Sequence, residues 1–227
     1  MAASAEHLSG LAALDGRHDA LLLDQWGVLH DGHQPYPGVH ETLARLAAAG
    51  TRLLLLSNTA RREADNLRML AGMGFDTACF EGVMTAGDDA RDALRSDAAG
   101  RALGRRCLPL SRPNERFLAE GVGFELVDTV AEADWLFLLS MEPPQQSLAA
   151  WRALLDDAAA RRLPMVCANP DFERVTLDGT RFEAPGRVAQ HYASLGGPVH
   201  WHGKPHGRIY RRSLARLGLP AARVLAV

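Results

Sequence analysis

The fold is inferred from the stretch Leu21-Leu-Leu-Asp-Gln-Trp-Gly-Val-Leu-His-Asp-Gly32. A short leucine run ends at Asp24 and gives way to a turn that contains Gly27. An apolar run bounded by polar and turn residues predicts a strand buried on both faces, as in a parallel sheet. Ligands bind at the carboxyl edge of such sheets, so Asp24 is a candidate site residue. An aspartate that only caps the next segment fits this stretch equally well.

Strand and helix patterns alternate after this stretch, with short links between them. This alternation indicates an α/β fold with a parallel, doubly wound sheet. For the first part of the chain we expect strands over 51–56 and 78–85 and helices over 39–49, 60–73 and 86–98.

The pattern restarts near residue 101, which predicts a second α/β unit inserted into the first. Its expected strands cover 106–110, 124–127, 134–139 and 165–169, and its expected helices cover 114–120 and 146–161. Asp178-Gly179 predicts a hairpin within 173–183. We therefore expect a core of residues 1–100 and 184–227 and an inserted unit of residues 101–183. The core sheet is expected to resume at Val199, followed by a helix over 206–217 and a last strand over 223–227.

The composition excludes several classes of protein. The 227 residues are 47% hydrophobic and 23% charged, with a formal net charge of -2, which is typical of a globular protein. This charge gives no basic patch for nucleic acid or a membrane surface. No signal peptide or membrane-spanning run is found, so a cytoplasmic protein is expected. The three cysteines, without C-x-x-C spacing, are expected to be free thiols.

Three polar residues are expected at strand ends of one sheet: Asp24, Ser57 and Lys204. A carboxylate nucleophile, a hydroxyl donor and a fixed cation suit phosphoryl transfer through an aspartyl intermediate. A bound Mg²⁺ would bring the anionic nucleophile and the anionic substrate together. Taken singly, Ser57 also fits a helix cap and Lys204 a solvated surface lysine.

The chain resembles the haloacid dehalogenase-like superfamily, in particular its class IIA, NagD-like phosphatases. The resemblance covers nearly the whole chain and rests on an ordered set of motifs. They are Asp24-Gln-Trp-Gly-Val-Leu-His-Asp-Gly32, Leu56-Ser-Asn-Thr-Ala60, Asn169-Pro-Asp171, and Gly203-Lys-Pro205 with Tyr210.

The resemblance implies a three-layered, Rossmann-like core with an inserted α/β cap. It implies a Mg²⁺-dependent phosphatase acting on a small phosphorylated metabolite, and it leaves room for a homo-oligomer. Asp24 would be the nucleophile and a metal ligand, and Trp26 would offer its backbone carbonyl to the metal. Ser57, Asn58 and Gly27 would contact the phosphate, and Lys204 would stabilise charge.

Two departures from the family pattern leave alternatives open. Trp26 stands where these phosphatases usually carry an aspartate that acts as general acid and base; Asp31 or His30 are candidate substitutes. The fourth motif, expected after a strand such as 224–227, does not occur, which favours a partial sequence of a longer protein. The alternatives are a non-catalytic relative that binds a phosphate ligand and, less favoured, a haloacid dehalogenase.

Other polar residues have more than one interpretation. His200, His202 and His206 cluster in the sequence, but we expect His200 and His202 on alternating sides of a strand and no zinc site. Asp171 fits either a role in ordering the hairpin or a position facing the substrate.

Overall fold

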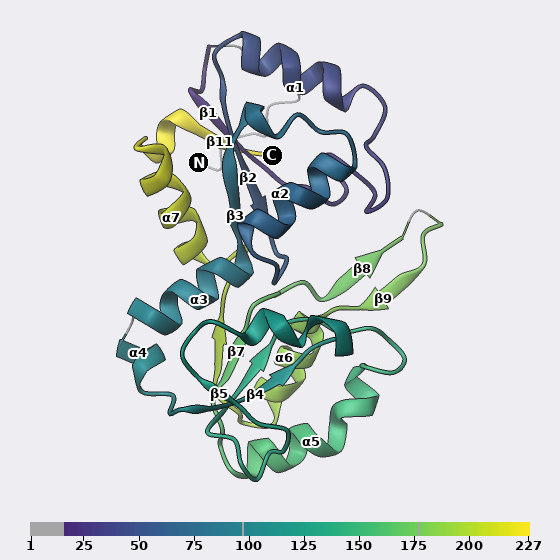
Figure 1. Cartoon of the computed structure of the whole chain (residues 1–227), viewed down its shortest axis with the longest axis vertical. Helices are drawn as coiled ribbons and strands as arrows, with labels where there is room; N and C mark the ends of the chain where they lie inside the picture. The colour runs from purple at the N-terminus through teal and green to yellow at the C-terminus, as the bar shows by residue number, and fades with distance from the viewer. Residues whose placement is uncertain (1–15, 97, 177) are drawn as a thin grey trace, which may run out of the picture.

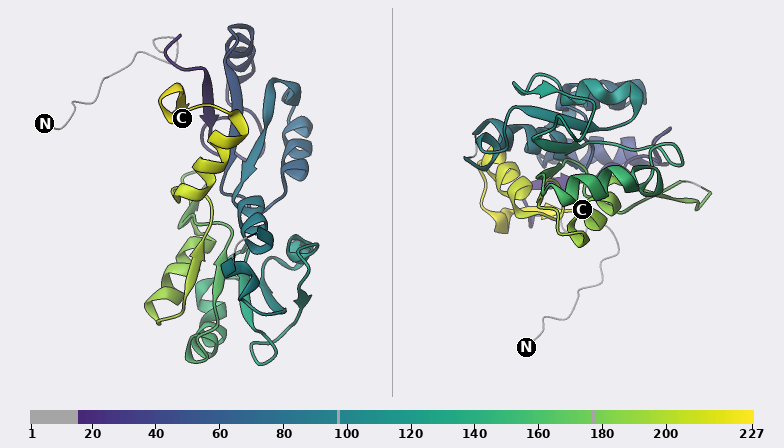
Figure 2. Two further views of the ribbon diagram at one scale, coloured as in Figure 1. Left: turned by 90° about the vertical axis from the view of Figure 1, so that its left-hand side faces the viewer. Right: turned by 90° about the horizontal axis from the view of Figure 1, so that it is seen from below.

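The computed structural model describes residues 16–96, 98–176 and 178–227. Its two parallel sheets follow each other along the long axis of the molecule (Figures 1 and 2). The strand order is β11-β1-β2-β3 in the first sheet and β10-β7-β6-β4-β5 in the second. The predicted α/β class with parallel sheets is confirmed.

The first sheet is buried on both faces, as its leucine runs predict. Side chains alternate along a strand, so Leu53 and Leu55 pack on one face and Leu54 and Leu56 on the other. The first face is covered by α1 and α2 and the second by α7, which gives three layers. The elements are β1 (Ala20–Leu23), α1 (Val39–Ala48), β2 (Arg52–Ser57), α2 (Glu63–Gly72), β3 (Phe80–Thr85), α7 (Gly207–Leu217) and β11 (Val224–Ala226), with a short 3₁₀ turn at Thr77–Cys79 and another at Ala221–Arg223.

The second sheet is also covered on both faces. Leu136 and Leu138 pack against α5 and α6, whereas Trp135 and Phe137 pack against α3 of the first unit. The helix α3 therefore joins the two units. The elements are α3 (Ala86–Ser96), α4 (Ala98–Arg101), β4 (Arg106–Leu110), the 3₁₀ helix η3 (Pro113–Ala119), β5 (Glu125–Leu126), β6 (Trp135–Leu138), α5 (Leu148–Ala160), β7 (Met165–Cys167), α6 (Pro185–Ser194) and β10 (Val199–Trp201).

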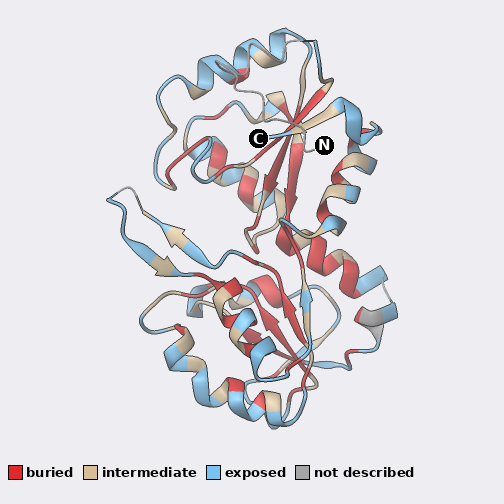
Figure 3. Cartoon of the chain, turned by 180° about the vertical axis from the view of Figure 1, so that it is seen from behind, coloured by how far each residue is buried: buried red, intermediate tan, exposed pale blue. Residues whose placement is uncertain are grey.

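The Asp178-Gly179 signal marks a hairpin, as predicted. Its antiparallel strands are β8 (Glu173–Val175) and β9 (Arg181–Glu183). Gly179 has a φ of +81°, a conformation that glycine adopts without strain. The hairpin lies between the two units and projects outward, and much of it is exposed (Figure 3).

The last strands correct one expectation. β10 pairs in parallel with β7, with Val199 opposite Met165, so it belongs to the second sheet and the first sheet does not resume there. The helix α6, which the sequence analysis missed, supplies the crossover that two parallel strands need. The second sheet thus extends 18 residues beyond the expected boundary at residue 183, since β10 ends at Trp201. The first sheet is completed instead by β11, which pairs with β1.

Three further observations concern the expected elements. The segment expected as a helix over 114–120 is the 3₁₀ helix η3. Cys79, Cys107 and Cys167 are free thiols, and the latter two are buried. Among the described residues, we find no helix with the length and apolar character needed to cross a membrane.

Arginines of the first unit hold η3 of the second. The buried guanidinium of Arg91 donates to Ala60 O at 2.9 Å and to Leu118 O at 2.6 Å. Burial lowers the pKa of Arg91 to about 10. Arg61 pairs with Glu115 at 3.0 Å, and Arg62 donates to Glu120 O at 2.8 Å. These bonds fix η3 against the loop that follows β2.

Removing the Arg91 guanidinium should destabilise the protein. Arg91→Met keeps most of the buried volume but leaves the carbonyls of Ala60 and Leu118 without this donor. We expect a loss of about 2–3 kcal/mol in the free energy of unfolding. Urea unfolding followed by tryptophan fluorescence, to which the buried Trp135 contributes, measures this loss.

Arg95→Met is the matched control, because Arg95 lies on the same helix and its exposed side chain donates to one carbonyl, Gly121 O, at 2.8 Å. We expect about 0.5 kcal/mol or less for this change. Equal losses for the two variants would contradict the role given to Arg91.

Candidate active site

The candidate site lies where the carboxyl edges of the two sheets face each other (Figure 1). Asp24 follows β1, and Ser57 is the last residue of β2. From the opposite side come Asp171, after β7, and Lys204, after β10. The structure therefore brings Asp24 and Lys204 together as predicted, but Lys204 arrives from the second sheet and not from the first.

Asp24 and Lys204 form a close ion pair. Lys204 Nζ lies 2.5 Å from Asp24 Oδ1 and 3.3 Å from Leu56 O. The backbone N–H of Gln25 also donates to Asp24 Oδ1, at 2.7 Å. Both of these contacts use Oδ1, which leaves Oδ2 as the oxygen directed to other partners. The side chain of Asp24 is 37% exposed, so a ligand in the crevice can reach it.

Asn58 connects the two sides of the crevice. Its Oδ1 accepts from Lys204 N at 2.7 Å, and its Nδ2 donates to Lys204 O at 3.1 Å and to Asp171 Oδ1 at 2.7 Å. Asn58 is buried, and the neighbouring Ser57 is half-buried. The amide of Asn58 is thus occupied by protein partners, whereas it was predicted to contact phosphate; the Ser57 hydroxyl accepts a long bond, 3.4 Å, from Thr59 N.

The carboxylate of Asp171 has an unusual environment for a residue at the mouth of a crevice. The residue as a whole is exposed, but the surrounding protein removes water from the carboxylate, which raises the pKa of Asp171. The charge of Asp24 acts in the same direction, and Asn58 and Lys204 act against it. A protonated Asp171 therefore persists to a higher pH than an ordinary aspartic acid.

The turn after Asp24 is held by its own hydrogen bonds. Gly27, with a φ of +84°, donates its N–H to His30 O at 2.9 Å. The buried side chain of Gln25 donates to Asn66 Oδ1 of α2 at 2.9 Å, a contact that the sequence analysis missed. The backbone N–H of Gly27, a predicted phosphate contact, is therefore used within the turn.

Trp26 lies at the side of the crevice next to the hairpin. Its side chain is 42% exposed, and its Nε1 donates to Val175 O of β8 at 3.3 Å. Gly32 packs so closely that an added Cβ would lie 2.4 Å from Trp26 Cη2. The indole therefore links the turn after β1 to the hairpin.

His30 and Asp31 were candidates to replace the missing general acid. Asp31 Oδ1 accepts from the backbone N–H groups of His33 and Gln34, at 2.7 and 2.8 Å, and these bonds lower the pKa of Asp31. His30 is 3% exposed, and burial lowers its pKa. The carboxylate of Asp31 thus stabilises the turn through its hydrogen bonds, and His30 is buried in the protein.

A buried charge network, not foreseen from the sequence, lies behind Lys204. Asp89 of α3 accepts from His202 Nδ1 at 2.9 Å and from Arg208 of α7 at 2.6 Å. Burial of Asp89 raises its pKa, but the bond and charge of His202, together with Arg208, outweigh this and lower it. The network fixes the end of β10 two residues before Lys204.

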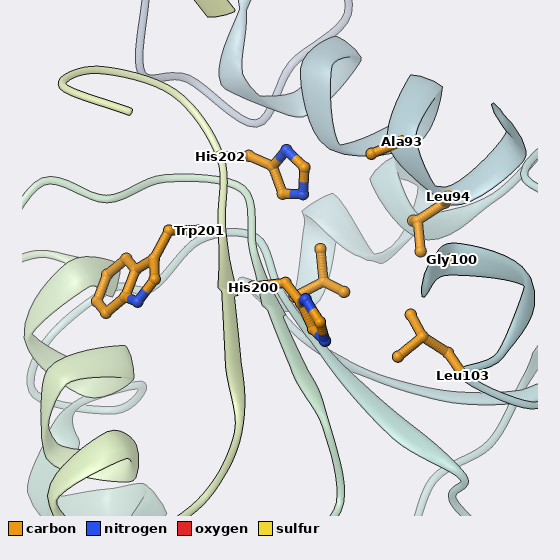
Figure 4. Close-up of a pocket in the computed structure, with 8 residues that line it drawn as sticks. Ala93, Leu94, Gly100, Leu103, His200, Trp201 and His202 are labelled. Atoms are coloured by element: carbon orange, nitrogen blue, oxygen red, sulfur yellow. The ribbon is translucent and has the colours of Figure 1, made fainter. Parts of the chain in front are cut away.

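His200 and His202 line the same cavity, of about 170 Å³, between β10 and α3 (Figure 4). The expectation that they lie on alternating sides of the strand is wrong, because residues two apart in a strand point to the same side. Its other lining residues include the apolar Leu94, Leu103 and Val166. Within residues 16–96, 98–176 and 178–227, no group of three or more His, Cys, Asp and Glu side chains is placed to hold a metal ion.

Comparisons with known proteins agree with this architecture. Residues 21–125 match the family described as haloacid dehalogenase-like hydrolase. A haloacid dehalogenase-like hydrolase from Brucella suis 1330 has a similar structure, with a TM-score of 0.85 and 27% identity, covering 95% of this chain and 79% of that one. The chain is therefore similar to haloacid dehalogenase-like hydrolases, in sequence over residues 21–125 and in fold over most of its length.

Two other relatives extend the comparison. Human chronophin is 34% identical over 124 residues, which are 53% of this chain and 39% of chronophin, so the chain spans well under two thirds of that relative. The glycerol phosphate phosphatase from Mycobacterium tuberculosis in complex with magnesium shares the fold, with a TM-score of 0.70 and 23% identity over 94% of this chain and 62% of that one.

A methyl group at Gly203 should displace the loop that carries Lys204. Gly203 has a φ of +94°, and an added Cβ would lie 2.6 Å from Asn58 Oδ1 and 2.7 Å from the Cβ of Ala86. We expect Gly203→Ala to lower the free energy of unfolding, measured with urea, by about 1–3 kcal/mol more than a positive φ alone requires.

Gly196→Ala supplies the reference, because Gly196 has a φ of +85° but no atom within 4 Å of an added Cβ. It should lose only the cost of the left-handed conformation, about 1–2 kcal/mol. Equal losses for both variants would show that the contact of Gly203 with Asn58 is not tight.

Proposed function

We propose that the protein is a phosphatase that cleaves a small-molecule phosphate monoester through an aspartyl-phosphate on Asp24. The observation that carries the proposal is the pairing of Asp24 with Lys204 at 2.5 Å, where two sheet edges meet. A carboxylate held against a fixed ammonium can accept a phosphoryl group whose charge that ammonium offsets. The name of the Mycobacterium tuberculosis relative, a glycerol phosphate phosphatase, supports the same class of reaction.

In the first step, Asp24 Oδ2 would attack the phosphorus, because Oδ1 is held by Lys204 and the Gln25 N–H. Lys204 would stabilise the negative charge on the phosphoryl oxygens, and the hydroxyl of Ser57 would donate to one of them. Asn58, whose side-chain amide bonds to both the backbone N–H and the backbone C=O of Lys204, would position the lysine. Release of the alcohol leaves the phosphoryl group on Asp24, and attack by water then frees inorganic phosphate.

The residues around Asp24 fit a magnesium ion. Mg²⁺ prefers oxygen ligands and is commonly held by one or two carboxylates together with water and substrate phosphate. The carboxylate of Asp24 and the backbone carbonyl of Trp26 would supply protein oxygens of this kind. When bound, the ion would reduce the repulsion between the carboxylate nucleophile and the phosphate. Mg²⁺ is thus proposed as the cofactor, as the magnesium complex of the Mycobacterium tuberculosis relative also suggests.

A second candidate function follows from Trp26. The indole cannot take the part of the usual aspartate, since its N–H is a donor only. A chain that keeps Asp24, Ser57 and Lys204 without a proton-transfer group would bind a phosphate ligand without turning it over. This candidate predicts ligand binding with no product.

Turnover of 4-nitrophenyl phosphate by the protein from its complete gene, with Mg²⁺ or with EDTA, tests the first proposal. We expect activity with Mg²⁺, its loss in EDTA and its recovery on adding Mg²⁺. Asp24→Asn removes the nucleophile and should lower kcat by roughly 10³-fold or more.

Asp65→Asn is the matched control, because Asp65 lies on α2 and pairs with the exposed Arg68 of the same helix. Its turnover should equal that of the unchanged protein. Phosphate binding by calorimetry without any turnover would refute the phosphatase and favour the binding protein.

A further inference from the structure

The proposed phosphatase reaction, on which this inference rests, needs a group that moves protons. The leaving alkoxide must gain a proton, and the water that attacks the aspartyl-phosphate must lose one. Trp26 cannot do either, and its N–H is bonded to Val175 O. The proton must therefore come from elsewhere in the crevice.

Three neighbours of Asp24 are unsuited to this task. Asp31 is held ionised by two backbone N–H groups, and His30 is buried and cannot reach a substrate. Burial and the charge of Asp24 raise the pKa of Tyr210, so its phenol is a weaker acid than an ordinary tyrosine and a poor proton donor to the leaving oxygen. None of the three combines access with a suitable proton affinity.

Asp171 lies on the side of the crevice where the leaving group must depart. In phosphoryl transfer the attacking and leaving oxygens lie roughly in line with the phosphorus. Asp24 attacks from the edge of the first sheet, so the leaving oxygen points toward the facing edge of the second sheet. Asp171 follows β7 on that edge and is held there by Asn58 Nδ2, at 2.7 Å from its Oδ1.

The environment of Asp171 also suits a general acid. Asp171 is an exposed residue, so a substrate can approach it. Loss of water around the carboxylate and the nearby charge of Asp24 raise the pKa of Asp171, despite the opposing effects of Asn58 and Lys204. A carboxyl with a raised pKa retains its proton where an ordinary aspartate has lost it.

We propose that Asp171 is the catalytic residue that transfers protons in this site, in place of the aspartate usual at position 26. As Asp24 Oδ2 forms its bond to phosphorus and the bond to the leaving oxygen breaks, the Asp171 carboxyl gives its proton to that oxygen. The resulting carboxylate then takes a proton from the attacking water. The water oxygen bonds to phosphorus, the Asp24–phosphorus link breaks, and both aspartates return to their starting states.

Asp171→Asn separates this role from a structural one. The amide oxygen of the variant can still accept from Asn58, but the side chain carries no proton that it can transfer. Two substrates are compared with Mg²⁺: phenyl phosphate, whose leaving group needs a proton, and 2,4-dinitrophenyl phosphate, whose leaving group departs without one. The parameter kcat/KM is used because it covers only the steps up to the departure of the leaving group.

We expect Asp171→Asn to lower kcat/KM for phenyl phosphate by about 10²–10⁴-fold and to change it by less than about tenfold for 2,4-dinitrophenyl phosphate. With the latter substrate, a burst of one dinitrophenol per protein molecule should precede slow turnover, because the base for the second step is lost. In Asp171→Ala, added formate should restore part of the activity toward phenyl phosphate. Such rescue would show that the activity was lost with the carboxyl group and not through poor folding of the variant.

Other outcomes overturn the inference. An equal loss of kcat/KM for both substrates, without a burst and without rescue by formate, would make Asp171 a positioning residue only. No loss for either substrate would leave it without a role. If the unchanged protein hydrolyses neither substrate, the phosphatase proposal itself fails, and this inference with it.

Discussion

The candidate site depends on the hydrogen bonds of the Asn58 side-chain amide. It bonds to the backbone N–H and C=O of Lys204 and to Asp171, so it ties the edge of the first sheet to two loops of the second. A lysine has a long, flexible side chain, and fixing its backbone limits where the ammonium can lie. The close pairing of Lys204 with Asp24 follows from this restraint.

The buried network behind Lys204 extends the same restraint into the core. Asp89, fully buried on α3, pairs with His202 and with Arg208 of α7. A buried carboxylate is tolerated only when its charge is compensated, so these partners cannot move independently of it. Together with the bonds of Arg91 to η3, the network holds the two units in one arrangement around the crevice.

Much of the fold could be predicted because its signals are local. The leucine runs mark β1 and β2, and Asp178-Gly179 marks the hairpin, through periodicity and turn chemistry that act over a few residues. The partner of β10 could not be predicted in this way, because strand pairing joins distant segments. A helix between two strands indicates that they can pair in parallel. Because the sequence analysis did not predict α6, it gave no sign that β7 and β10 are neighbours.

The candidate site likewise combines features with local sequence signals and contacts between distant segments. Asp24, Ser57 and Lys204 are predicted as site residues from their types at strand ends and from the family motifs. The bond between Asn58 and Asp171 spans 113 positions, and that between Gln25 and Asn66 spans 41, and no spacing rule indicates such contacts. The residue proposed to act as general acid in place of one at position 26 could likewise not be predicted. Its choice depends on which side chains the fold places next to Asp24.

The pairing of β10 with β7 has a consequence for modular engineering. An exchange of residues 101–183 for the corresponding piece of another protein would cut through the second sheet and leave β10 without its hydrogen-bonding neighbour. β10 would then have to pair with a strand of the other protein. Any shift in that pairing would also shift Lys204, which follows β10. The segment that can be exchanged therefore extends through residue 204. In such a chimera the lysine comes from the exchanged segment, and the aspartate that it pairs with comes from the recipient core.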